Sequence, residues 1–102
     1  MYHIVWEFIS KQGHEEKFLK AYGPDGDWVK FFRSGEGYIS TILLRDVGNN
    51  RRFLTIDEWR SKTAYAAFRA HRGKEYQHLD EKFSALTDYE ALIGSFVTAN
   101  EQ

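Results

Sequence analysis

The sequence contains no cysteine, a single proline and no excess of either charge. Without cysteine the chain has no disulfide, thiolate metal ligand or cysteine nucleophile, which is typical of proteins that do not rely on an oxidising compartment. Fourteen Lys and Arg and fifteen Asp and Glu are interspersed, so they create no field that would attract a nucleic-acid backbone. The N-terminal apolar run is too short to span a bilayer and has no basic leader. We therefore expect a cytoplasmic protein that binds neither nucleic acid nor membrane.

The chain has 102 residues, a length that fits one domain over residues 1–102 with a thin core. Aromatic residues make up 17% of the sequence, more than a core of this size ordinarily requires. We expect some of these aromatic side chains to line a cavity or a subunit interface.

A strand that turns directly into a long helix is the feature around which the rest of the chain is organised. Phe53–Trp59 is rich in β-branched and aromatic residues and predicts a strand, although it carries charge at Asp57 and Glu58. Ser61 is a good N-cap for the following helix, and Gly73 predicts a kink or break in it. Mostly apolar residues recur every three or four positions along this helix and therefore lie on one face of it: Tyr65, Phe68, Arg72, Tyr76, Leu79, Phe83 and Leu86.

The remaining segments complete an alternating pattern of strands and helices. The sequence predicts strands at Tyr2–Ser10, Tyr38–Asp46 and Ala91–Thr98 and short helices at His14–Tyr22 and Trp28–Arg33. A turn at Val47–Asn50 joins two strands as an antiparallel hairpin. The order β-α-β-β-α-β predicts an α+β ferredoxin-like fold, with a four-stranded antiparallel sheet and both helices on one face.

The second face of this sheet would be apolar and uncovered. Val5, Ile9 and several aliphatic residues of the second strand fall on it, so a homodimer that pairs two sheets would remove the exposed patch. Glu7 falls on the same face and would need an arginine or hydroxyl partner there, a structural role more than a catalytic one.

Several segments resemble the antibiotic-biosynthesis monooxygenase-type (ABM) domain of the dimeric α/β barrel superfamily. The resemblance rests on Val5-Trp6-Glu7-Phe8, Gly13, Gly37-Tyr38 and Asp57-Glu58-Trp59-Arg60-Ser61, followed by Tyr65, Phe68 and His71. It implies a dimeric α/β barrel. Members for which the family is named oxidise polycyclic phenols with O2 and without metal or organic cofactor, relatives cleave haem, and many have no assigned reaction.

A cofactor-free oxygenation needs an aromatic-lined cavity for an electron-rich ring and a polar group that manages the phenol proton. The candidates for substrate contact are Trp6, Trp28, Phe32, Trp59, Tyr65, Phe68 and His78. His71 and Arg72 are the candidate catalytic residues, because either can hydrogen-bond a phenolate and hold it in its charged form. For any one aromatic residue, plain packing in the core is the more common role.

Two other kinds of site are less favoured. In haem-degrading relatives an asparagine, a tryptophan and a histidine form the site; this chain has Trp6, Phe68 and His78 there, so only the histidine matches. His71, Glu75 and His78 have ligand-like helical spacing, but Gly73 interrupts it, and we expect no metal and no cofactor.

The sequence thus supports two classes of function. One is a small cofactor-independent monooxygenase acting on an aromatic or quinol-type molecule, and the other is a non-catalytic small-molecule binding or interaction module of the same fold. The two differ in whether buried polar groups converge on an aromatic cavity.

Overall fold

The computed structural model describes residues 1–100; residues 101–102, the end of the predicted domain, lie outside the described residues. Its elements are β1 (Tyr2–Ser10), α1 (Glu15–Tyr22), α2 (Asp27–Phe32), β2 (Tyr38–Asp46), β3 (Asn49–Trp59), α3 (Lys62–His71), α4 (Gly73–Phe83), the 3-10 turn η1 (Ser84–Leu86) and β4 (Thr87–Val97).

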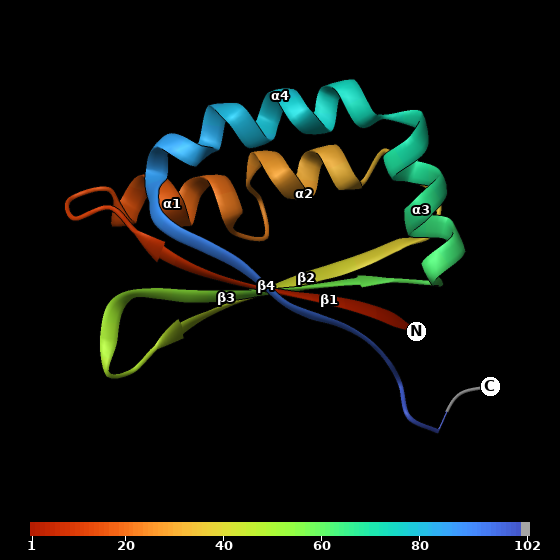
Figure 1. Ribbon diagram of the computed structural model, residues 1–102, viewed down its shortest axis with the longest axis horizontal. Coiled ribbons are helices and arrows are strands. Elements are labelled where there is room, and N and C mark those ends of the chain that lie inside the picture. The colour runs from red at the N-terminus through yellow and green to blue at the C-terminus, as the bar shows by residue number, and fades with distance from the viewer. Residues whose placement is uncertain (101–102) are drawn as a thin grey trace.

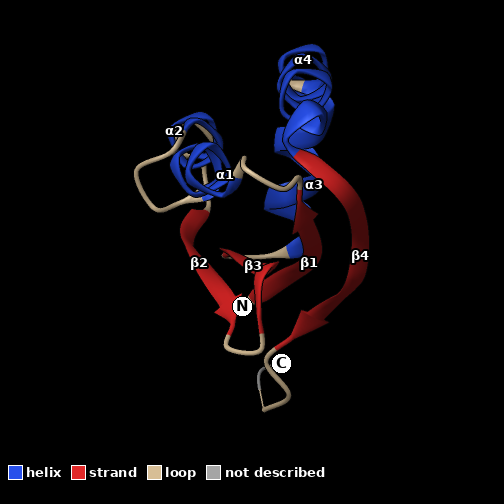
Figure 2. Ribbon diagram, turned by 90° about the vertical axis from the view of Figure 1, so that its left-hand side faces the viewer, coloured by secondary structure: helices blue, strands red, loops and turns tan. Residues whose placement is uncertain are grey.

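The four strands form one antiparallel sheet in the order β2-β3-β1-β4. All the α-helices lie on the same side of this sheet, as Figure 1 and the turned view of Figure 2 both show. This arrangement confirms the predicted α+β ferredoxin-like fold with a four-stranded antiparallel sheet.

The long helical segment begins and breaks where the sequence predicts. The Ser61 hydroxyl accepts a hydrogen bond from the Ala64 backbone N–H at 3.0 Å, which satisfies a free donor of the first turn of α3. Arg72 leaves helical geometry with φ −114°, so α3 ends at His71 and α4 begins at Gly73. The Arg72 side chain binds the Glu75 carboxylate and donates to Ser34 Oγ at 2.8 Å, and these contacts hold the break in place.

Two strands are longer than predicted. β3 begins at Asn49 and β4 at Thr87, whereas the sequence pattern begins them at Phe53 and Ala91. The added residues are mostly polar, so they give no hydrophobic alternation, and cross-strand pairing alone makes them strand. In the β2–β3 hairpin, Asp46 pairs with Asn49.

Aromatic side chains fill most of the core between helices and sheet. Trp59, Phe18 and Phe53 are fully buried. The Trp59 ring lies 5.1 Å from the Phe68 ring between centroids. A Cβ at Gly35 would lie 2.5 Å from Phe68 Cδ1 and 2.9 Å from the Trp59 ring, so only glycine fits this close approach.

The sheet face opposite the helices carries exposed apolar side chains. Ile42, Ile56 and Val5 are cross-strand neighbours on it, and Ile42 remains 51% exposed. Glu7 has the arginine partner that its position requires, with its carboxylate 2.6 Å from Arg52 Nε. The predicted apolar face is therefore present, and nothing in the described chain covers it.

We predict that Trp59→Ala lowers the free energy of unfolding by about 3–5 kcal/mol, because it empties a large volume that its neighbours cannot refill. Trp59→Phe keeps a ring in the site and should cost clearly less. Urea denaturation of the two variants and the parent measures the difference. An unchanged midpoint for Trp59→Ala would show that the indole does not support the core.

Candidate functional site

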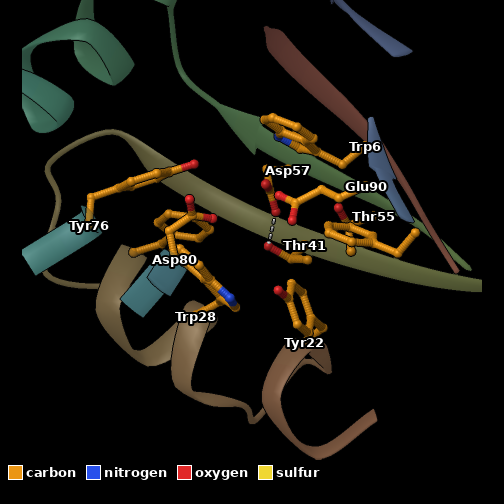
Figure 3. A pocket seen from close by; sticks show the side chains of 11 residues that line it. Trp6, Tyr22, Trp28, Thr41, Thr55, Asp57, Tyr76, Asp80 and Glu90 are labelled. Carbon is orange, nitrogen blue, oxygen red and sulfur yellow. Dashed lines mark hydrogen bonds between the residues drawn. The ribbon is translucent and has the colours of Figure 1, made fainter. Parts of the chain in front are cut away.

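A pocket opens between the helices and the middle of the sheet. It is lined by Trp6, Phe8, Tyr22, Trp28, Phe32, Thr41, Thr55, Asp57, Tyr76, Asp80 and Glu90. Aromatic rings from α1, α2, α4 and β1 form the walls, and polar side chains of β2 and β3 form the floor (Figure 3). The mixture of aromatic walls and a few polar groups is typical of a small-molecule site.

The pocket is narrow in this state. About 390 Å³ between its atoms is empty, a volume that includes the open mouth, but the centre of a water molecule can occupy only about 30 Å³ of it. That space holds roughly two or three waters. A ring-sized ligand therefore has to displace side chains at the mouth, where Asp80 and Glu90 are exposed and Trp6 is half-buried.

Asp57 is the most unusual residue of the floor. It is only 7% exposed, although carboxylates are seldom buried, and no ion-pair partner reaches it within residues 1–100. Its Oδ1 accepts a hydrogen bond from the Thr41 hydroxyl at 2.7 Å. Thr41 Oγ1 lies 2.8 Å from the Tyr38 hydroxyl, so Tyr38, Thr41 and Asp57 form a hydrogen-bonded chain that ends at the pocket.

Burial dominates the electrostatics of this carboxylate. It raises the pKa of Asp57 from an ordinary 3.8 to about 6, against the opposing effect of the hydrogen bond from Thr41. Burial likewise raises the pKa of Tyr38, and the charge of Asp57 adds to that shift. Asp57 is thus a carboxylate that can take up a proton near neutral pH, the property required of a general base.

The sequence-based candidates do not surround a single cavity. Trp6, Trp28 and Phe32 line the pocket just described. Phe68, His71 and Arg72 line a different, open depression beside α3 and the loop before β2; its empty volume of about 920 Å³ includes solvent outside the protein surface. The six residues expected around one ligand therefore line two separate hollows in this structure, and the end of α3 lies outside the pocket between helices and sheet.

The remaining candidates have other surroundings. Trp59 is fully buried in the core and lines neither the pocket nor the depression. Tyr65 is half-buried, and its hydroxyl accepts a hydrogen bond from Arg69 at 2.9 Å. His78 is exposed on α4. The roles assigned to these residues from sequence stay predictions.

Sequence reasoning missed Asp57, Asp80 and Glu90 as pocket residues. Asp57 and Glu58 are neighbours on β3 and point to opposite faces, so the two carboxylates cannot act as a pair. The useful signal was the register of Phe53, Thr55, Asp57 and Trp59, which puts one lone carboxylate on the buried face. Asp80 and Glu90 reach the pocket only through packing of α4 and β4.

Within residues 1–100, no group of three or more His, Asp and Glu side chains is placed to hold a metal ion. His71 ends α3, while Glu75 and His78 belong to α4, and Glu75 binds Arg72. No helix in the same part of the chain is both long and apolar enough to cross a membrane.

Fold and pocket together define a ferredoxin-like α+β protein with a site of small-molecule type. The family model "Antibiotic biosynthesis monooxygenase" matches residues 1–79, and the chain belongs to this family. No curated protein gives a significant match to the sequence.

Solved structures with the same fold cover nearly the whole chain. A putative antibiotic biosynthesis monooxygenase from Deinococcus radiodurans has a TM-score of 0.77 at 12% identity, over 100% of this chain and 96% of its own. SnoaB from Streptomyces nogalater, a cofactor-independent oxygenase, has a TM-score of 0.72 at 18% identity, over 98% and 94%. A putative antibiotic biosynthesis monooxygenase from Nitrosomonas europaea has a TM-score of 0.73 at 14% identity, over 97% and 99%. At these identities the likeness establishes the fold alone.

The raised pKa of Asp57 predicts a specific pH dependence of stability. Between about pH 4 and pH 6 the folded state binds a proton that the unfolded state has released, so the free energy of unfolding falls as pH rises through this window. Asp57→Asn removes the titration. We expect the difference in free energy of unfolding, variant minus parent, to increase by roughly 3 kcal/mol between pH 3 and pH 7. Urea denaturation across this range measures it, and a constant difference would contradict the shifted pKa.

Proposed function

We propose that this protein is a cofactor-independent monooxygenase that oxidises a phenolic or quinol-type aromatic molecule in the pocket between helices and sheet. The observation that carries the proposal is Asp57, a buried carboxylate without a counter-ion at the floor of an aromatic pocket. The proposal also fits the family and the oxygenase named among the solved structures of the same fold. The absence of cysteine is compatible with a cytoplasmic location.

The proposed chemistry begins with removal of the phenol proton. Asp57, with a pKa of about 6, accepts this proton at neutral pH, and the resulting phenolate is electron-rich enough to react with O2. Thr41 and Tyr38 keep the Asp57 carboxylate oriented. For an anthrone, whose enol form is the phenol, a ring CH2 and one O2 give a ring C=O and one H2O. The carbon loses four electrons, and O2 takes up four as its atoms become the carbonyl oxygen and the oxygen of water. The reaction therefore needs no further reductant.

A binding module without catalysis is the second candidate, and the small free volume of the pocket favours it. About 30 Å³ for water centres leaves no preformed space for a polycyclic ring. A protein that only binds would use the same walls and the same Asp57 carboxylate as a hydrogen-bond acceptor. The two functions therefore differ in turnover and share the ligand contacts.

We also propose that the chain forms a homodimer through the outer face of the sheet. Ile42 and Leu44 on β2 and Phe96 on β4 are each 45–51% exposed on or beside this face. Burial of such side chains against a second copy would stabilise the pair by roughly 25 cal/mol for each Å² of apolar surface removed from water. The pocket opens on the opposite side of the sheet, so both copies keep it.

Oxygen uptake tests the catalytic proposal. We expect the parent, supplied with anthrone-like or naphthol-like phenols under air and with a metal chelator, to consume O2 above the uncatalysed background. The rate should rise with pH and reach half its maximum near pH 6, because Asp57 must be ionised to act as base. Asp57→Asn should lower the rate by roughly 10²–10⁴-fold.

Asp25→Asn is the matched control, because its side chain is 96% exposed in the loop before α2. It should leave oxygen uptake unchanged. If the parent consumes O2 no faster than the uncatalysed background, the oxygenase proposal is wrong for these phenols. The same assay with His71→Ala and Arg72→Ala tests the roles that the sequence suggests for those two residues.

Sedimentation velocity at micromolar concentration tests the dimer. The parent should sediment with twice the 12.0 kDa mass of one chain. Ile42→Asp places a charge on the apolar face, midway along the edge strand β2, and should shift the protein towards monomer. Val47→Asp, at the fully exposed tip of the β2–β3 hairpin, should not. A parent that sediments as a 12.0 kDa monomer would contradict the proposal.

A further inference from the structure

The pocket has a one-sided charge. Asp57 lies at its floor, Asp80 reaches it from α4, and Glu90 reaches it from β4, whereas no Lys, Arg or His is among the lining residues of the described chain. Figure 3 shows the carboxylates of Asp57, Asp80 and Glu90 around one space bounded by Trp6, Trp28 and Tyr76. A ligand in this space therefore lies among negative charges and electron-rich aromatic faces.

The acidic groups act on one another and on the phenols around them. Glu90 is exposed as a residue, but partial burial of its carboxyl group raises its pKa, and the negative charge of Asp80 adds to this shift. Burial also raises the pKa of Tyr22, with a further contribution from the charge of Glu90. Asp80 and Glu90 therefore share one electrostatic environment at the side of Tyr22, because like charges interact noticeably only over short distances in salt solution.

One cation, Arg69, acts electrostatically on Asp80 from outside the pocket. The guanidinium carbon of Arg69 lies 3.6 Å from the centre of the Tyr76 ring, and Arg69 donates a hydrogen bond to the Tyr65 hydroxyl. Arg69 is thus already engaged between α3 and α4 and does not line the pocket.

A buried donor without a partner gives an independent sign of a ligand. Trp28 is 7% exposed and lines the pocket, yet its Nε1 has no hydrogen-bond partner. Figure 3 shows this nitrogen on the side of Tyr22. The indole N–H lowers the pKa of the Tyr22 hydroxyl against the effects of burial and of Glu90, so it faces that hydroxyl, although the two groups do not form a hydrogen bond of ordinary geometry. An unpaired buried donor costs free energy that an acceptor atom of a ligand would recover.

We propose that the pocket selects a phenolic amine: a ring whose hydroxyl group donates to Asp57 and accepts from Trp28 Nε1, and whose ammonium group faces Asp80 and Glu90. An ammonium group is attracted both by the two carboxylates and by the faces of Trp6, Tyr22 and Tyr76. A carboxylate or sulfonate on the same ring is repelled. This inference rests on the proposed use of the pocket as the substrate site and adds the charge of the substrate.

Three ligands with the same ring test the inference: naphthol, its aminomethyl derivative and its carboxylate derivative. We expect the ammonium form to bind the parent on the order of tenfold more tightly than the carboxylate form, with naphthol between them. Calorimetric titrations without oxygen, at low ionic strength, measure the three affinities independently of turnover. The ratio should shrink when salt is added.

Asp80→Asn and Glu90→Gln should each reduce the preference for the ammonium form severalfold. Glu81→Gln is the matched control, because Glu81 is the neighbour of Asp80 on α4 but lines no part of the pocket; it accepts a hydrogen bond from Gln77. The Glu81→Gln variant should prefer the ammonium form over the carboxylate form as strongly as the parent does. All three acidic residues are exposed, so their substitution leaves the core intact.

Equal affinities, tighter binding of the carboxylate form, or no binding of any of the three ligands would overturn the inference. Its failure is distinguishable from failure of the proposed reaction. Charge-selective binding without oxygen uptake would support the inference and contradict the proposed oxygenase reaction. Oxygen uptake without a charge preference would support the reaction and contradict the inference.

Discussion

The buried face of β3 imposes the constraint on which the rest of this structure depends. Its four inward residues are Phe53, Thr55, Asp57 and Trp59, with an aromatic ring at each end and polar groups in the middle. Phe53 stacks on Phe18 of α1, and Trp59 packs against Phe68 of α3. The helices are therefore fixed to the two ends of the strand, and the pocket lies over its polar centre.

Placing polar groups at the centre of a thin core has an energetic cost that the structure only partly offsets. Thr41 hydrogen-bonds to Asp57, but no cation compensates the carboxylate, so its protonated form is favoured up to about pH 6. A purely structural interior would gain stability from an apolar residue there. A residue that opposes stability at neutral pH and faces a pocket is a good candidate for a functional group.

Charged residues on the two faces of the sheet have different surroundings. On the outer face Glu7 pairs with Arg52, which also binds Asp46, so these three charges are paired. On the inner face Asp57 and Glu90 share a pocket with Asp80 of α4, and its lining includes no cation. Paired charges suit a surface that a second copy covers, whereas unpaired carboxylates suit one that a ligand completes.

The sequence by itself determined the order of the elements, the cap at Ser61 and the break at Gly73, because these depend on local periodicity and on backbone chemistry. It also indicated the apolar outer face, which follows from alternation along single strands. Only the tertiary structure decided the site. Asp80 and Glu90 meet Asp57 through packing between elements distant in sequence, and the end of α3 turns His71 and Arg72 away from them. Such proximity depends on helix placement across the sheet, which no local pattern in the chain encodes.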